Sequence, residues 1–185
     1  MILLIDICKE KMHYHEFVRP IEDILRDAEE PFITRHYSEL SSDDLASCHR
    51  LIIAGTSLMD NSYSRHLKRF DFLRSFHKPV LGICGGMQIL CAVNGCKLVK
   101  GAEIGLIGIS FNAEFLGIIG PREVYLLHNF AVKDDRVLHD NFQIYSRSIG
   151  TGYIQTVRHK RFRHYGVLFH PEVRNKDMIR NFLEA

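Results

Sequence analysis

The fold is decided by Lys78-Pro79-Val80-Leu81-Gly82-Ile83-Cys84-Gly85-Gly86-Met87-Gln88-Ile89-Leu90. Its apolar run, residues 80–83, predicts a buried parallel strand, and Pro79 is typical of a strand start. Apolar residues at helical spacing follow from Met87 onward. We therefore predict a strand, a tight turn and a helix, with Cys84 at the turn.

A cysteine at such a turn has the setting of a nucleophile. Its small neighbours Gly82, Gly85 and Gly86 let the chain bend sharply, as in a nucleophile elbow. At a helix N-terminus, unpaired N–H groups and the helix dipole favour the thiolate. The alternative is a buried cysteine that only fills space, but the three neighbouring glycines make that interpretation hard to sustain.

Length and composition fit an ordinary globular protein. The 185 residues predict one domain over residues 1–185, with 46% hydrophobic and 25% charged residues and a net charge of +2. Five cysteines without a Cys-x-x-Cys pair argue against a disulfide framework and favour the reducing cytoplasm. The apolar N-terminus is too short for a signal peptide, and no run reaches membrane-spanning length, so no membrane association is expected.

Strands alternate with helices in the first half of the chain, which predicts an α/β fold. We expect a flavodoxin-like, mostly parallel sheet with helices on both faces, followed by a β-rich C-terminal extension whose last strand returns to the elbow. The predicted strands are 2–7, 32–35, 51–54 and 80–83, then 107–111, 123–127, 142–146, 153–157 and 165–169. The predicted helices are 13–29 with Pro20 as a kink or start, one capped by Ser41 or Ser42, one carrying Leu67, Phe70, Leu73 and Phe76, one after Cys84 that stops at Asn94-Gly95, and a last one capped by Asn175.

A thiol nucleophile needs a base and a group that orients the base. The pair His170 and Glu172 meets this need, because His170 directly follows an apolar strand and Pro171 stiffens the turn between them. His-Pro-Glu by itself is also compatible with a plain turn. Beside the cysteine elbow, the catalytic interpretation is favoured.

An acyl-enzyme mechanism also needs N–H donors for the developing oxyanion. The N–H of Gly85 follows the nucleophile, and a second donor is expected from Gly55, at the end of the neighbouring strand. Gln88 lies one helical turn beyond Cys84, where it either hydrogen-bonds a polar substrate or is an exposed helix residue.

These residues resemble the class I glutamine amidotransferases. The resemblance rests on Gly82-x-Cys84-x-Gly86-Met87-Gln88 with the distant His170-Pro171-Glu172, and it extends over nearly the whole chain, including the first strand and Glu103-x-Gly105. Segments 165–173 and 179–182 look most like the amidotransferase subunit of GMP synthase.

The resemblance implies that a Cys-His-Glu triad hydrolyses glutamine to glutamate and ammonia through a thioester. The ammonia would pass to a separate synthetase subunit, and no cofactor is implied. His128 and Asn129 sit where the family contacts the substrate backbone. Two departures stand out: Gly55-Thr56-Ser57 replaces the usual Gly-Gly-Pro, and Gly85 replaces a larger residue, which should loosen the elbow.

Several alternatives stay open. The synthetase partner could be that of anthranilate or aminodeoxychorismate synthase. The chain could instead be a stand-alone cysteine hydrolase for γ-glutamyl or peptide bonds, or a regulatory module that retains only the elbow.

The basic run 158–164 is expected to form a solvated hairpin tip, with docking to an acidic partner as a second possibility; no nucleic-acid motif accompanies it. The spacing of Cys84, Cys91 and Cys96 does not predict a metal site. No phosphate-binding loop is present, so no nucleotide site is predicted.

Overall fold

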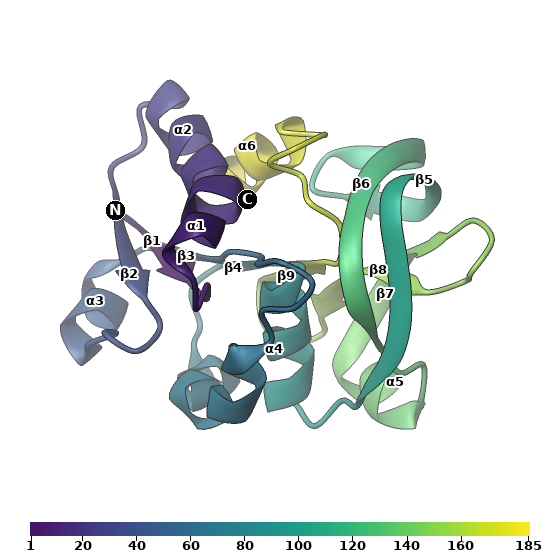
Figure 1. Ribbon diagram of the computed structural model, residues 1–185, viewed down its shortest axis with the longest axis horizontal. Helices are drawn as coiled ribbons and strands as arrows, with labels where there is room; N and C mark the ends of the chain where they lie inside the picture. Colours follow the sequence, from purple (N-terminus) through teal and green to yellow (C-terminus); the bar gives the residue numbers. More distant parts are fainter.

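The computed structural model describes residues 1–185, which build one mixed sheet of nine strands (Figure 1). In sheet order, the first five strands run parallel: β2 (Phe32–His36), β1 (Ile2–Asp6), β3 (Arg50–Ile53), β4 (Val80–Ile83) and β9 (His164–Val167). The other four are antiparallel: β8 (Ile154–His159), β7 (Phe142–Ser148), β5 (Leu98–Phe115) and β6 (Ile118–Val132). The expected α/β sheet with a β-rich extension is confirmed, and the last strand does pair with the elbow strand β4.

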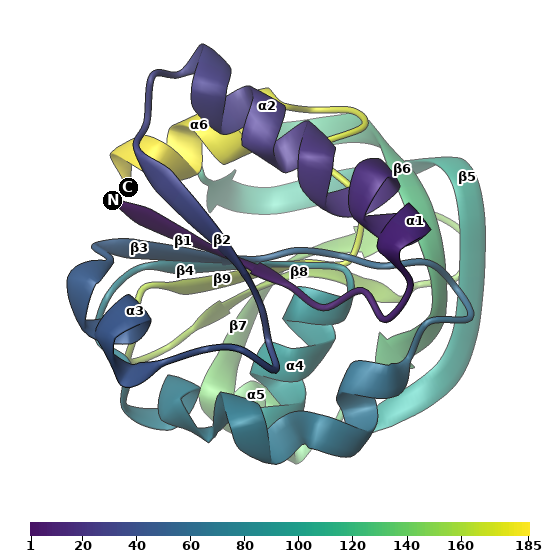
Figure 2. The same cartoon turned by 60° about the vertical axis from the view of Figure 1, so that its left-hand side comes forward.

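The central parallel strands β1, β3 and β4 are largely apolar because both of their faces are covered, whereas the edge strand β2 is half-buried and carries Thr34, Arg35 and His36. Along β1, Ile2 and Leu4 pack into one core while Leu3 and Ile5 pack into the other, as the alternation of side chains in a strand requires. Figure 2 shows α2 (Arg19–Asp27) and α6 (Asp177–Glu184) over one face and α4 (Gly85–Val93) under the other. The 3₁₀ helix η2 (Ser62–Ser75) shares the second core.

The first helical segment differs from the single helix predicted over residues 13–29. It begins as α1 (Lys11–His13), passes through a π-helical turn, η1 (Tyr14–Val18), and continues as α2. Pro20 lies in the first turn of α2, directly after the π-helical turn. The prediction that Pro20 marks the start of the regular helix is therefore confirmed.

The helix predicted around Phe70 forms as the 3₁₀ helix η2. The apolar positions Leu67, Phe70, Leu73 and Phe76 are spaced by three throughout, which matches the three residues per turn of a 3₁₀ helix better than the 3.6 of an α-helix. Phe70 and Leu73 are fully buried against the sheet, while Phe76 is the residue that ends the helix.

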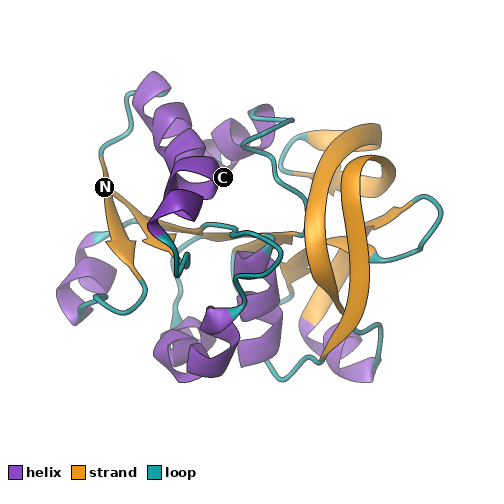
Figure 3. Cartoon of the chain, in the orientation of Figure 1, coloured by secondary structure: helices purple, strands orange, loops and turns teal.

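The antiparallel region is dominated by one long hairpin, β5–β6, which extends well beyond the predicted segments 107–111 and 123–127 (Figure 3). Its two-residue turn is Leu116-Gly117, and both residues have positive φ, 47° and 72°. This is the backbone of a type I′ turn, whose twist matches that of the flanking strands. A β-bulge interrupts the pairing between Lys100 and Glu103.

Four smaller features complete the fold. Ser41 caps α3 (Ser42–Ser47) through a capping box with Asp44, as predicted. The basic run forms the tip between β8 and β9, also as predicted. The predicted cap of the last helix is wrong: Asn175 adopts a positive φ of 75° and donates its amide to the Glu123 carbonyl (3.0 Å), and Lys176 precedes α6 instead. The short α5 (Arg136–Asn141) links β6 to β7.

Candidate active site

Cys84 lies at the sharp turn between β4 and α4. Its φ of 49° and ψ of −104° fall outside the regions that L-residues favour, so the tertiary structure must hold this conformation in place. The Cys84 N–H donates to the carbonyl of Val167 (2.7 Å), which ties the turn to the end of β9. The thiol faces the carbonyl oxygen of Leu127 on β6, 3.7 Å from Sγ.

The glycines around the turn are required by close contacts. A Cβ added at Gly82 would lie 2.6 Å from the backbone of Gly86, so strand and helix could not meet there. A Cβ at Gly85 would lie 2.6 Å from Ile7 and 3.2 Å from the ring of Tyr63. These side chains fill the space beside Gly85, so the expectation that this glycine loosens the elbow is wrong.

His170 and Glu172 follow β9 and form a buried pair. Nδ1 of His170 lies 2.7 Å from Oε1 of Glu172, and neither side chain is exposed to solvent. Because a carboxylate only accepts, Nδ1 carries the proton of this bond, and the other ring nitrogen, Nε2, has no partner on the chain. The ring of Phe17, from the π-turn η1, packs over the imidazole with centroids 5.2 Å apart.

Gly55 lies between the side chains of Cys84 and His170. A Cβ at this position would lie 2.7 Å from Cε1 of His170 and 3.2 Å from Cβ of Cys84. The imidazole and the cysteine therefore flank one backbone position at the end of β3, although 86 residues separate them in the sequence. All three residues follow the carboxyl ends of neighbouring parallel strands, where ligands bind in open α/β sheets.

The charges of the site favour a protonated imidazole. Burial acts to lower the pKa of His170, but Glu172 and Cys84 outweigh it and raise this pKa well above its ordinary value. A protonated ring donates from Nδ1 to Glu172 and offers Nε2–H to the sulfur. The arrangement can therefore hold a thiolate–imidazolium pair, the reactive form of a cysteine nucleophile.

Two N–H groups are free to stabilise an oxyanion. The N–H of Gly55 donates no hydrogen bond within the chain. Gly85 is the first residue of α4, where an N–H has no intrahelical acceptor. The sequence analysis named these two groups as oxyanion donors, and that role stays a prediction.

Gln88 lines the same cavity, but its amide is already bound on both sides. Its Oε1 accepts from the hydroxyl of Tyr63, and its Nε2 donates to the carbonyl of Phe130 (3.0 Å). Gln88 is buried rather than an exposed helix residue. To bind a substrate through its side chain, it would have to exchange one of these two partners.

A strap, residues 56–61, closes the cavity from the side of β3. Asn129 donates its amide to the carbonyl of Leu58 on the strap (2.7 Å). Asp60, at the other end, accepts from the N–H of Lys9 (2.7 Å) and from Thr56 (3.0 Å), and its carboxylate meets the ring of His13 (3.2 Å). Burial acts to raise the pKa of Asp60, but these contacts outweigh it and lower this pKa.

His128, predicted to contact the substrate, turns its ring into the protein interior. Nδ1 lies 3.0 Å from the Gly101 carbonyl and Nε2 lies 3.1 Å from the Glu103 carboxylate. Burial lowers the pKa of His128, while Glu103 acts in the opposite direction. Leu127 contacts the thiol and Asn129 contacts the strap, and His128 also lines the cavity although its ring is bound in the interior.

The cavity beside Cys84 has a volume of about 10 Å³, which leaves room for about one water molecule. Residues from η2, α4, β6 and the strap line it. A substrate the size of an amino acid therefore requires the strap or the Tyr63–Gln88 pair to move.

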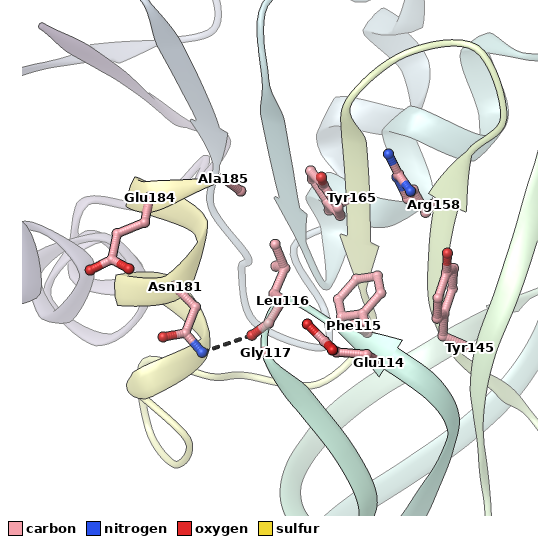
Figure 4. Close-up of a pocket in the computed structure, with 10 residues that line it drawn as sticks. All are labelled: Glu114, Phe115, Leu116, Gly117, Tyr145, Arg158, Tyr165, Asn181, Glu184 and Ala185. Carbon is pink, nitrogen blue, oxygen red and sulfur yellow. Dashed lines mark hydrogen bonds between the residues drawn. The ribbon is translucent and has the colours of Figure 1, made fainter.

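A larger hollow, of about 470 Å³, lies beside α6 and the tip of the β5–β6 hairpin (Figure 4). Arg158 lies over the ring of Tyr165 at its wall, and Asn181 is bound to the Leu116 carbonyl (2.7 Å). None of its lining residues is a cysteine or a histidine, so it does not offer the nucleophile and base found beside Gly55.

The structure contains no group of three or more acidic, cysteine or histidine side chains that could hold a metal ion. None of its helices combines the length and apolarity needed to cross a membrane.

Sequence reasoning missed two residues of this site, Tyr63 and Asp60. Both follow β3 in a polar stretch without periodicity, and their partners Gln88 and His13 lie 25 and 47 residues away in the sequence. The one available signal was Gly85: a glycine where the family has a larger residue leaves space that another side chain can fill.

Comparisons with known proteins show the family of this chain. The sequence model of the family "Glutamine amidotransferase class-I" matches residues 14–185. A glutamine-hydrolysing GMP synthase subunit of Pyrococcus abyssi is 33% identical over 143 residues, which cover 71% of this chain and 72% of that protein. Aminodeoxychorismate synthase component 2 of Klebsiella aerogenes is 29% identical over 99% of both chains.

Among solved structures, a protein of Thermoplasma acidophilum described as a GMP synthase subunit superposes with a TM-score of 0.84 over 99% of this chain and 92% of its own. At 24% identity, this likeness concerns the fold. The family model covers nearly the whole chain, and the Pyrococcus relative supports the same assignment. The chain therefore belongs to the class-I glutamine amidotransferase family.

Proposed function

We propose that this chain hydrolyses glutamine with Cys84 as nucleophile, His170 as acid and base, and Glu172 as the group that orients the imidazole. The observation that carries the proposal is that Cys84 and His170 flank Gly55 so closely that a Cβ there would meet both, beside the His170–Glu172 pair. That arrangement supplies a thiol, a base and a free N–H in one place, which acyl transfer requires.

The reaction follows from these groups. The thiolate attacks the side-chain amide carbon of glutamine, and the N–H groups of Gly55 and Gly85 stabilise the oxyanion that forms. His170 gives its proton to the departing nitrogen, so ammonia leaves and a thioester remains. Water then attacks the thioester, His170 takes a proton from it, and glutamate departs with the thiolate restored.

We propose that the ammonia passes to a separate synthetase subunit, and that this subunit is of the GMP synthase kind. The 33% identity to the Pyrococcus GMP synthase subunit supports this choice. The second candidate is the aminodeoxychorismate synthase kind, favoured by a relative that matches over 99% of the chain at 29% identity.

Docking of the partner is expected to open the strap and to set the Gly55 turn. The closed cavity supports this, because glutamine does not fit while Asn129 holds Leu58 and Tyr63 holds Gln88. The isolated chain should therefore hydrolyse glutamine slowly.

The test is ammonia release from glutamine by the chain alone, with the synthetase subunit of GMP synthase, and with the synthetase subunit of aminodeoxychorismate synthase. We expect the first partner to raise the rate at least tenfold. Full activity of the isolated chain would reject gating by the partner. Turnover of a γ-glutamyl peptide, with none of free glutamine under any condition, would instead establish a stand-alone hydrolase.

A further inference from the structure

The interior of the antiparallel region holds a carboxylate, Glu103, that is buried and surrounded by hydrogen-bond donors. Its Oε2 accepts from Ser148 (2.9 Å) and Gln155 (2.7 Å), and its Oε1 accepts from Thr151 (2.6 Å). The fourth partner is Nε2 of His128, directly opposite Glu103 in the β5–β6 pairing. One side chain thus joins β5, β6, β7, β8 and the turn between β7 and β8.

The ring of His128 is fixed on both sides. Its Nδ1 faces the carbonyl of Gly101, which can only accept, so Nδ1 carries a proton. Its Nε2 faces the carboxylate, and this contact needs a second proton between Nε2 and Oε2 of Glu103. The pair has a net charge of zero whichever atom holds that proton, which makes its burial tolerable. The β-bulge before Glu103 directs the Gly101 carbonyl toward the ring.

We propose that Glu103 and His128 are positioning residues for glutamine binding. They act by holding the Leu127–Asn129 end of β6 in place, and the proposal rests on the function proposed above. His128 lies between the two residues that reach the site: the Leu127 carbonyl faces the Cys84 thiol, and Asn129 binds the strap. Neither Glu103 nor the His128 ring has to touch the substrate.

This role predicts a particular kinetic effect. Cys84, His170 and Glu172 follow β4 and β9, and the hydrogen bonds of Cys84 and His170 to β6 reach the carbonyls of Leu127 and Tyr125 rather than Glu103 or the His128 ring. Loosening the Leu127–Asn129 end of β6 therefore weakens the binding of glutamine more than it disturbs the groups that break its bonds. Such a loss of uniform binding raises KM and leaves kcat nearly unchanged.

The principal test is Glu103→Gln, assayed for glutamine hydrolysis with the synthetase partner present. An amide cannot accept from all four donors, because one of its two polar atoms is itself a donor. We expect KM to rise by about tenfold, the effect of leaving one buried donor unpaired, with kcat within about threefold of the wild type. An unchanged KM, or a loss in kcat alone, would overturn the proposal.

Two further variants sharpen the test. In His128→Asn, the amide can still donate to the Gly101 carbonyl but does not reach Glu103, so KM should rise as in Glu103→Gln. The double variant should be no worse than either single one, because both remove the same contact. Additive effects of the two substitutions would contradict a single positioning unit.

Ser146→Ala is the matched control. Ser146 is equally buried in the same region, but it binds Thr156 (2.8 Å) and does not contact β6. It should lower thermal stability without changing KM. An equal rise of KM in Ser146→Ala would mean that general destabilisation explains the effect.

A second readout does not depend on catalysis. In Glu103→Gln, amide hydrogen exchange over residues 126–132 should become about tenfold faster than in the wild type, with residues 2–6 of β1, which do not contact Glu103, unchanged. If no partner elicits glutamine hydrolysis from the wild type, the proposed function fails, yet this measurement still decides whether Glu103 holds β6. Unchanged exchange over residues 126–132 would overturn the positioning role by itself.

Discussion

The two regions of the sheet use polar residues in opposite ways. In the parallel region the central strands β1, β3 and β4 are apolar except at their ends, and the reactive groups Cys84, His170 and Glu172 lie beyond the strand ends. In the antiparallel region the polar groups lie inside, between the strands and under the hairpin. The buried polar residues there are Glu103, His128, Ser146, Ser148, Gln155, Thr156 and His159.

The groups proposed to react therefore lie in one region of the sheet, and the residues that hold the cavity wall in place lie in the other. Parallel strands covered on both faces leave only their ends for chemistry, and those ends meet at one edge of the sheet. The antiparallel strands contribute one wall of the cavity, the end of β6, and a hydrogen-bonded interior fixes that wall. Substitutions should accordingly affect turnover in the first region, and binding or stability in the second.

The largest effect is expected from Cys84→Ala. Without the thiol no thioester forms, and glutamine hydrolysis in the presence of the partner should fall by about 10⁴-fold or more. A glutamine-mimicking electrophile should label the wild type and not this variant. Cys91→Ala is the control, because Cys91 is buried on the same helix, away from the cavity. Residual labelling of Cys84→Ala would place the reactive thiol elsewhere.

Glu172→Gln should follow, with kcat reduced by about 10³-fold because the imidazole loses its orienting carboxylate. The Glu172 charge also raises the pKa of His170. In the amide variant, His170 should therefore lose its second proton at a lower pH than in the wild type. The alkaline limb of the profile of kcat/KM against pH should shift to lower pH. A reduced rate with an unshifted profile would contradict the assigned electrostatic role of Glu172.

His164, on the strand β9 where the two regions join, predicts acid sensitivity of the fold. Burial lowers its pKa to about 4, helped by the nearby His159 and His77, and its Nε2 donates to the Phe76 carbonyl (2.8 Å). Because the unfolded chain takes up this proton near pH 6.5, stability should fall as the pH drops from 6.5 to 4, by about 3 kcal/mol in all. Urea unfolding of His164→Gln should show a shallower pH dependence; an identical slope would be inconsistent with a buried neutral ring.

The smallest effect concerns the Ser146–Thr156 pair in the antiparallel interior. Ser146→Ala leaves the Thr156 hydroxyl unpaired and should cost about 1–3 kcal/mol in the free energy of unfolding. The double change Ser146→Ala with Thr156→Val removes both partners and should restore most of that loss. Equal stability of the single and double variants would show that this hydroxyl finds another partner.

Much of the fold could be predicted because its signals are local. The apolar runs around Ile5, Ile52 and Leu81 indicated the parallel strands, and Ser41 marked a helix start. The prediction failed where local signals are ambiguous. The spacing of three around Phe70 accompanies a 3₁₀ helix instead of an α-helix. Asn175 does not cap α6, because its side-chain amide donates to the Glu123 carbonyl on β6. The hairpin β5–β6 was underestimated because its pairing depends on contacts across the turn at Leu116.

The residues of the site divide in the same way. Cys84, His170 and Glu172 stand beside glycines, a proline and apolar strands, and those neighbours are visible in the sequence. The partners of Gln88 and His128 are not, because Tyr63 and Glu103 approach them only after the sheet has formed.

By itself, the sequence determined the family, the order of elements and which side chains could carry the chemistry, since these follow from periodicity and from residues adjacent in the chain. Only the tertiary structure decided that Gly55 joins the cysteine to the imidazole, that the His128 ring turns inward, and that the cavity is closed. The physical reason is that hydrogen-bond partners and the shape of a cavity depend on distances between strands. Those distances are set by packing of the whole sheet, which no local stretch of sequence encodes.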